Sequence, residues 1–300
     1  MTFKQSPPGF QNVRGPLIQS VQAQLNAKGF NAGTVDGVWG DNTMRALRAW
    51  QSANGINPSG EIDDQTWAQL TASAVPDLSQ RALQLTGDWE GTGYTGANGN
   101  FDGQGITWGV VGFTWGNSEL QRILGEVRAL YPAIFTRAFG NLEPQIVNIL
   151  GQPLASQMAW ARSISTNGGD KIAPQWAAAF KALGAASEVQ QIENHHAQHY
   201  WDAGAQLAAN FRLQSEAGLA LCFDIAVQNK VTHDLLADIQ RTIGSPGMSE
   251  ADKMRAIAHV VASHANPKYY TDVLTRKMAF VTGQGAVHGA RYDITCWGIG

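Results

Sequence analysis

Two carboxylic acids, Glu90 and Asp102, lie in contrasting local sequences that suit them to act as an acid and a base. Glu90 follows Trp89 at the end of an apolar helical segment, and such surroundings favour the protonated carboxyl. Asp102 lies among glycines with little apolar cover, so we expect it to stay ionised. Glycoside hydrolysis uses such a pair, one carboxyl to protonate the leaving oxygen and the other to activate water. The hydroxyl of Thr107 could hold that water.

Simpler explanations exist for each of these residues. Most Asp and Glu side chains are only solvated, and Asp102-Gly103 is ordinary turn chemistry. Asp88, just before Glu90, is a rival acid. Trp108 alternates with glycines beside the proposed site, and we expect its ring to stack on a sugar. The residue types and spacing therefore suggest glycosidase chemistry without excluding a structural role.

A histidine-rich segment and two cysteines are the competing features. His195 and His199 are four residues apart on an expected helix, which is a spacing of metal ligands. No third ligand is indicated, and a solvated or interface helix face explains the cluster as well. Cys222 lies in an apolar run, where a buried and unreactive thiol is the default, and Cys222 and Cys296 are too few for a disulfide scaffold. We expect no metal and no cofactor.

The sequence of the larger, second part of the chain predicts the elements that must position the carboxylates. Residues 77–85 form an amphipathic pattern that runs into Glu90, and the glycines between residues 91 and 105 exclude a helix. Residues 106–115 are rich in β-branched and aromatic side chains and predict one or two short strands. Helical patterns dominate residues 118–277. We therefore predict a mostly helical α+β domain with a small sheet lobe beside a helical lobe.

A smaller module precedes this domain. Residues 1–72 carry three short helical patterns, and the small-residue segment 73–76 ends at a proline, Pro76. We place a linker at 73–76 and assign residues 1–72 and 77–300 to the two domains. A helical module of this size needs nearly all its large apolar side chains buried.

Composition narrows the functional class. The chain has 300 residues, 44% hydrophobic and 15% charged, with a formal net charge of −3 that gives no basic surface for nucleic acid. Its longest apolar stretch, residues 217–227, is interrupted by Asp224 and is shorter than the ~20 residues that span a bilayer. The N-terminal residues lack the apolar segment of a secretory signal. We expect a monomer made in the cytoplasm that binds neither nucleic acid nor membrane.

The front module resembles the peptidoglycan-binding domain found on many cell-wall hydrolases. The resemblance rests on residues 21–30, 35–43 and 47–55 together with Gly60 and Thr66-Trp67, and its most distinctive part is the Asp-Gly-x-x-Gly-x-x-Thr segment. It implies that the groove beside this turn contacts the glycan and the stem peptide of the wall. The binding candidates that it implies are Asp36, Gly40, Asp41, Asn42 and Thr43.

The second domain resembles the inverting chitosanases, glycoside hydrolase family 46, of the lysozyme superfamily. The resemblance is carried by residues 82–90 and by the segment 102–114 with its Asp-Gly-x-Gly-x-Thr pattern. It implies that Glu90 is the general acid, Asp102 the general base and Thr107 the holder of the water. Gln104 stands where the family has a basic residue, and we expect it to contact substrate.

The same resemblance places Asp224 on a buried aspartate that belongs to an ion-pair network supporting the acid, and we expect Arg276 to be its partner.

Together the two resemblances imply a phage endolysin of Gram-negative hosts, made in the host cytoplasm, that cuts the peptidoglycan glycan strand between amino sugars in the periplasm. Other functions stay open. They are a lytic transglycosylase that uses Glu90 alone, a chitosanase, a metal amidase that uses the histidine cluster, and a non-enzymatic wall-attachment protein.

Overall fold

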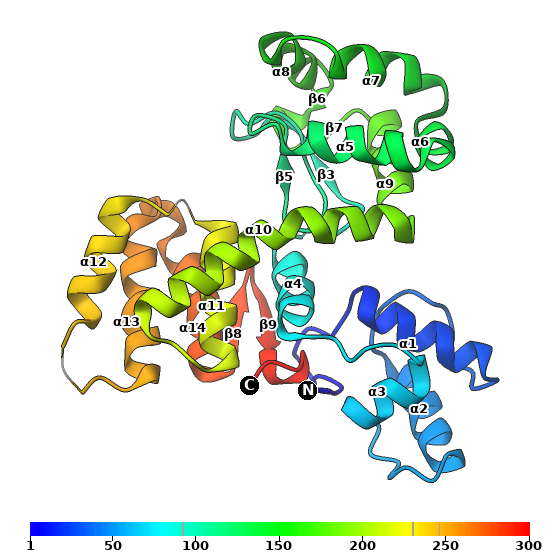
Figure 1. Cartoon of the computed structure of the whole chain (residues 1–300), viewed down its shortest axis with the longest axis vertical. Coiled ribbons are helices and arrows are strands. Elements are labelled where there is room, and N and C mark those ends of the chain that lie inside the picture. The colour runs from blue at the N-terminus through cyan, green and yellow to red at the C-terminus, as the bar shows by residue number, and fades with distance from the viewer. Residues whose placement is uncertain (92, 230, 246) are drawn as a thin grey trace. The chain divides into compact units, whose positions relative to one another are not determined.

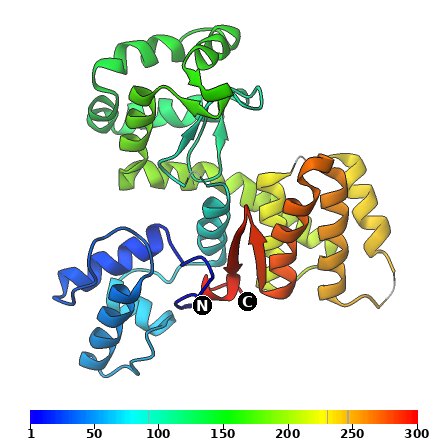
Figure 2. The same cartoon turned by 180° about the vertical axis from the view of Figure 1, so that it is seen from behind.

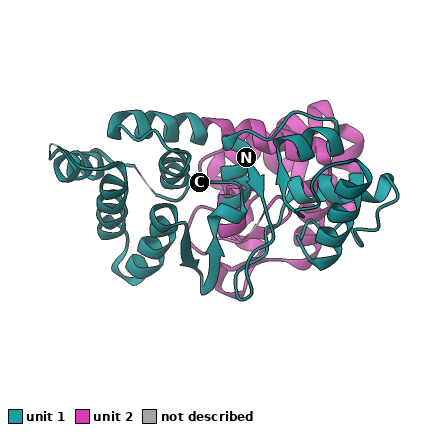
Figure 3. Cartoon of the chain, turned by 90° about the horizontal axis from the view of Figure 1, so that it is seen from below, with its two compact units in different colours: residues 1–85, 200–300 teal, residues 86–199 magenta. Residues whose placement is uncertain are grey.

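The computed structural model describes every residue except Thr92, Lys230 and Pro246. The expected α+β class is confirmed, because helices dominate and the strands form small antiparallel sheets. The chain divides into two compact units, Met1–Leu85 with Tyr200–Gly300 and Thr86–His199 (Figure 3). The expected linker at 73–76 lies inside the first unit, so the domain division into 1–72 and 77–300 stays a prediction.

The front of the first unit contains the three expected helices. They are α1 (Pro16–Ala27), α2 (Asp41–Ala53) and α3 (Asp64–Thr71). Pro16 occupies the first turn of α1, where no backbone donor is lost, and the side chain of Asp63 caps α3 by accepting a hydrogen bond from Thr66 N at 2.7 Å. The large apolar side chains Trp39, Leu47 and Trp67 are all buried.

Backbone pairing brings the two ends of the chain together within this unit. No sequence pattern indicated this pairing. Strand β1 (Thr2–Phe3) pairs with β2 (Ile62–Asp63), and Phe3 also forms a bridge with Trp297. Lys4 N donates to Cys296 O at 3.1 Å. The N- and C-termini accordingly lie side by side in both views (Figures 1 and 2).

The rest of the first unit is a helical bundle with one hairpin. Its elements are the end of α10 (Ser187–Phe211), α11 (Glu216–Gln228), α12 (His233–Ile243), α13 (Glu250–His264), η3 (Pro267–Tyr269), α14 (Tyr270–Thr282), β8 (Gln284–Val287), β9 (Ala290–Asp293) and η4 (Ile294–Cys296). Helices α11, α12 and α13 each begin at a serine or threonine whose hydroxyl accepts from the first turn. The sequence analysis missed the β8–β9 hairpin. Its signal is His288-Gly289, where both residues have positive φ, as the tightest hairpin turn requires.

The second unit places a three-stranded sheet, β3-β4-β5, among short helices (Figure 1). The strands are β3 (Ala97–Asn98), β4 (Thr107–Trp108) and β5 (Phe113–Thr114), so β4 and β5 fall inside the predicted segment 106–115. The remaining elements are the end of α4 (Leu78–Trp89), α5 (Glu119–Leu130), α6 (Pro132–Phe139), η1 (Gly140–Leu142), α7 (Glu143–Leu150), α8 (Leu154–Ser163), β6 (Ser165–Thr166), η2 (Asn167–Gly169), β7 (Lys171–Ile172), α9 (Pro174–Gly184) and the start of α10.

Aromatic side chains form the core of this unit. Trp160 lies between two other tryptophans, with its ring centroid 5.1 Å from that of Trp115 and 5.0 Å from that of Trp176. Phe180, on the same helix as Trp176, is fully buried. Such contacts fix short helices that would be unstable in isolation. Across the described residues, none of the helices combines the length and the apolar character needed to cross a bilayer.

Candidate functional site

Glu90 lies at the C-terminal end of α4. Its backbone N–H donates to Thr86 O at 2.9 Å, which continues the helical hydrogen bonding past Trp89. Gly91 follows with φ of 74°, a left-handed conformation that ends the helix and is accessible to glycine without strain. Trp89 is buried, whereas Glu90 is half-buried. The sequence therefore fixes the Glu90 backbone between a buried tryptophan and a helix-ending glycine.

Asp102 lies in the loop that joins β3 to β4. Asn98 is paired with Thr107 in the antiparallel register, so the loop spans the residues between them. Asp102 Oδ1 accepts from Gln104 N at 2.9 Å, and Asn100 Oδ1 accepts from Gly105 N at 2.7 Å. These side-chain-to-backbone bonds shape the turn and leave the Asp102 carboxylate exposed to solvent.

Thr107 occupies β4 with an unsatisfied hydroxyl. Its neighbours across the sheet are Asn98 and Thr114. The Oγ1 atom is buried and has no hydrogen-bond partner among the described residues. An unpaired buried polar atom costs about 1–3 kcal/mol, and a bound water or ligand group is a standard reason for its presence. The hydroxyl therefore lacks a protein partner that would compete with a water molecule for its hydrogen bond.

The prediction that Trp108 contacts sugar is wrong. Trp108 is 0% exposed, and its indole N–H donates to Phe180 O at 3.2 Å. Successive residues of a strand point to opposite faces, so turning Thr107 outward puts Trp108 into the core. The exposed aromatic side chain of this region is instead Phe101, 55% exposed beside Asp102, which the sequence analysis missed. A bulky aromatic in a glycine-rich loop with no apolar neighbours was the available signal. Gln104, the other expected contact, is exposed.

A second buried carboxyl group, Glu193 on α10, also escaped the sequence analysis. Its Oε2 accepts from Val110 N at 2.8 Å, while Oε1 is buried without a partner in the described structure. Gly109 has φ of +89°, and a Cβ there would lie 2.6 Å from Glu193 Oε2. Burial raises the pKa of Glu193 well above its ordinary value, and the bond from Val110 only partly opposes this. Glu193 thus holds the β4–β5 turn against α10 in its protonated form.

Replacing Glu193 by Gln is expected to stabilise the protein at alkaline pH. Between the ordinary pKa and the raised native pKa, the native state keeps a proton that the unfolded state has lost, so stability falls as pH rises. The slope is at most ~1.4 kcal/mol per pH unit for one group. Glutamine cannot ionise and keeps an acceptor for Val110, so urea unfolding should show an advantage at pH 8 that shrinks towards pH 4.

The matched control is Glu188→Gln on the same helix. Hydrogen bonds from its own backbone N–H and from the Ser187 hydroxyl lower the pKa of the Glu188 carboxyl, so this replacement should give no such gain. Parallel pH curves for wild type and Glu193→Gln would contradict the assignment.

The structure brings Asp224 and Arg276 together in the first unit. Arg276 Nη2 lies 2.6 Å from Asp224 Oδ1, and Lys277 Nζ, which the sequence analysis did not include, lies 2.5 Å from Oδ2. All three side chains are buried. Burial by itself would raise the pKa of Asp224, but the two cations outweigh it and lower that pKa to about 2. Asp224, Arg276 and Lys277 therefore form a buried ion cluster that joins α11 and α14.

The histidine-rich segment forms pairs with glutamates. His196 Nε2 lies 2.8 Å from Glu126 Oε2, and His199 Nε2 lies 3.8 Å from Glu119 Oε1. Within the described ranges, no group of three or more His, Cys, Asp or Glu side chains is arranged to hold a metal ion. These contacts attach α10 to α5, so a structural role accounts for the segment.

The five front-module candidates line one pocket of about 250 Å³. Asp36 accepts from Val38 N at 2.8 Å and from Gln22 Nε2 at 2.9 Å, and these bonds lower its pKa. Thr43 is only 1% exposed, and its hydroxyl accepts from Gln22, so it supports the wall of the pocket. Asn42 lines both this pocket and a cavity of about 520 Å³ that also includes Arg45. Asp36, Asp41 and Asn42 are the exposed polar residues of the set.

Comparison with known proteins identifies this front segment. Residues 14–70 match the family model described as putative peptidoglycan binding domain. An uncharacterized protein in the bpoA1 3′ region of Kitasatospora aureofaciens is 31% identical over 61 residues, which is 20% of this chain and 52% of that protein. The chain thus spans about half the length of this curated relative.

Two solved structures resemble the chain beyond the peptidoglycan-binding domain. One is a Gynuella sunshinyii GH46 chitosanase in complex with chitotetraose, with 16% identity, a TM-score of 0.46, and coverage of 70% of this chain and 87% of that one. The other is described as a chitosanase complex, with 18% identity, a TM-score of 0.48, and coverage of 71% and 94%. At this identity the activity has to be argued from the side chains of the chain itself.

Proposed function

We propose that this protein is a glycoside hydrolase that cleaves the glycan strand of peptidoglycan. In this proposal Glu90 is the general acid, Asp102 the general base and Thr107 the residue that holds the attacking water. The observation that carries it is the partnerless Thr107 hydroxyl on β4, at the end of the same loop that presents Asp102 to solvent. A hydrolase needs a held water molecule, and this hydroxyl can both donate to it and accept from it.

The reaction balances with these three groups. Glu90 gives its proton to the glycosidic oxygen as the bond to the anomeric carbon breaks. Asp102 takes a proton from the water held by Thr107, and the water oxygen bonds to the anomeric carbon from the opposite face, which inverts its configuration. Inverting enzymes place the two carboxyl groups ~6.5–9.5 Å apart to leave room for this water. The next cycle requires only that a proton returns from Asp102 to Glu90 through solvent.

The peptidoglycan-binding domain would keep the enzyme on its polymer. A tethered catalytic unit meets its substrate at an effective concentration set by the tether, so successive cuts need no new encounter from solution. The exposed Asp36, Asp41 and Asn42 side chains offer hydrogen-bond groups to the sugars or the stem peptide. An endolysin role, with action on the periplasmic wall, follows from this combination as part of the proposal.

Digestion of purified sacculi tests the proposal. We expect soluble fragments with new reducing ends, whose anomeric configuration, followed by NMR in the first minutes, is opposite to that of the bond cut. Anhydro-sugar ends would identify a lytic transglycosylase, and new amino groups an amidase. Binding to sacculi without any released fragment would indicate an attachment protein. A parallel digest of chitosan shows whether deacetylated glycan is also accepted.

A further inference from the structure

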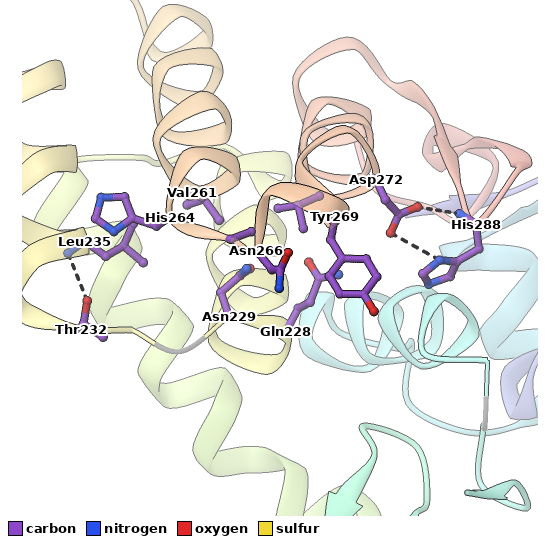
Figure 4. Close-up of a pocket in the computed structure, with 12 residues that line it drawn as sticks. Gln228, Asn229, Thr232, Leu235, Val261, His264, Asn266, Tyr269, Asp272 and His288 are labelled. Carbon is purple, nitrogen blue, oxygen red and sulfur yellow. Dashed lines mark hydrogen bonds and ion pairs between the residues drawn. The ribbon is translucent and has the colours of Figure 1, made fainter. Parts of the chain in front are cut away.

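The first unit contains another cavity, of about 550 Å³, that none of the functions above uses. It lies where the end of α11, the start of α12, the end of α13 and the segment η3–α14 meet (Figure 4). Three amide side chains, Gln228, Asn229 and Asn266, line it beside the ring of Tyr269. A cluster of amides beside an exposed aromatic ring is a typical lining for a sugar-binding site.

Local contacts fix which way two of the amides face. Gln228 Oε1 accepts from Lys277 Nζ at 2.7 Å, and Lys277 is itself held by Asp224. Asn266 Oδ1 accepts from Lys268 N at 3.0 Å, which caps η3. Because both oxygens are occupied, the NH2 groups of Gln228 and Asn266 are the parts left to donate to a ligand. The buried ion cluster therefore also orients a donor of the cavity.

Asn229 supplies the complementary acceptor. Its Oδ1 atom is buried and has no partner among the described residues. A ligand that donates an N–H or O–H to this atom would remove the cost of leaving it unpaired. The cavity thus has one acceptor, Asn229 Oδ1, for a ligand donor, and two NH2 donors, on Gln228 and Asn266, for a ligand acceptor.

The charged groups around the cavity favour a neutral ligand over an anionic one. His264 Nε2 lies 2.8 Å from Asp238 Oδ2, and His288 Nδ1 lies 3.3 Å from Asp272 Oδ2. Among the described lining residues there is no Lys or Arg. Among these lining residues, a carboxylate or phosphate would therefore meet the Asp272 carboxylate and two histidines that are already paired with aspartates. A neutral ligand with one N–H and one carbonyl matches the amides better.

An aromatic platform completes the site. Tyr269 is 52% exposed, and its ring lies beside Gln228 and Asn266 in the cavity (Figure 4). Lys268 Nζ lies 5.3 Å from the ring centroid. An exposed ring of this kind packs against the apolar face of a sugar while its hydroxyl stays in water.

We propose that this cavity binds an N-acetylated amino sugar. The acetamido N–H donates to Asn229 Oδ1, the acetamido carbonyl accepts from the NH2 of Gln228 or Asn266, and the sugar ring packs on Tyr269. The acetamido group has the one donor and one acceptor that the amides require. Peptidoglycan as the source of this sugar rests on the proposed function, whereas the binding of the sugar does not.

Calorimetric titration with a tetramer of N-acetylglucosamine tests the site. The protein used is the full-length Glu90→Gln variant, which should not turn over the ligand. We expect Asn229→Leu and Tyr269→Ala each to weaken binding at least about tenfold, the effect of losing one buried hydrogen bond or one stacking contact. Tyr270→Ala is the matched control, because Tyr270 is also exposed but does not line the cavity. Thermal unfolding of each variant checks that it folds.

Two further ligands make the result decisive. A glucosamine tetramer lacks the acetamido group and should bind at least tenfold more weakly than the acetylated tetramer, and a glucose tetramer should behave likewise. Equal binding of the three tetramers, tighter binding of the glucosamine tetramer, undetectable binding, or unchanged affinity in Asn229→Leu would each overturn the proposal. If the variants lose binding but wild type releases no reducing ends from sacculi, the proposed function fails while this site stands.

Discussion

Glu90→Gln and Asp102→Asn are each expected to lower the rate of release of reducing ends from sacculi by ~10²–10⁴-fold, the contribution of one positioned acid or base. Glutamine cannot protonate the glycosidic oxygen, and asparagine cannot accept a proton from water. Both replacements keep the size of the side chain, and Asp102→Asn keeps the oxygen that accepts from Gln104 N. Neither residue belongs to the peptidoglycan-binding domain, so co-sedimentation with sacculi should be unchanged.

Asp88→Asn is the matched control for Glu90→Gln, because Asp88 is a half-buried carboxyl group in the last turn of the same helix. It should keep most of the activity. A Glu90→Gln protein that still digests sacculi would contradict the proposed role of Glu90 as general acid. An active Asp102→Asn protein combined with an inactive Glu90→Gln protein would indicate the transglycosylase, in which Asp102 is structural.

Replacing Asp224 by Ala is expected to lower the free energy of unfolding by about 3–5 kcal/mol, the usual cost of breaking a buried ion pair. The change leaves the Arg276 and Lys277 cations buried without their shared anion. Urea unfolding followed by circular dichroism measures the loss. Asp238→Ala breaks solvent-accessible pairs with Arg241 and His264 and should cost only about 1 kcal/mol.

The same cluster predicts how wild type responds to acid. Because the pKa of Asp224 is lowered to about 2 from 3.8, its stabilising contribution is present above pH 3.8 and is lost as pH falls towards 2. Wild type should therefore lose stability steeply in this window, whereas Asp224→Ala should show a shallower slope there. Equal slopes for the two proteins, or a loss from Asp224→Ala no larger than that from Asp238→Ala, would show that the cluster does not stabilise the fold.

Local sequence was sufficient for the elements that carry the candidate site. The helix ending at Glu90, the glycine-rich loop around Asp102 and the strands at Thr107 and Phe113 depend on propensity and turn chemistry over a few residues. The three front helices and the class of the fold are confirmed for the same reason.

Tertiary structure decided which side chains face solvent and which distant segments meet. Trp108 is buried because Thr107 takes the opposite face of a two-residue strand, and a strand so short gives no alternation from which to read its faces. Glu193 accepts a hydrogen bond from Val110, and Asn229 and Asn266 line one cavity, although long stretches of chain that no periodicity links separate the members of each pair. The pairing of Phe3 with Trp297 is of the same kind. Residue types and local spacing determine which chemistry is available, whereas the burial and the partners of each group depend on packing between segments that the sequence keeps far apart.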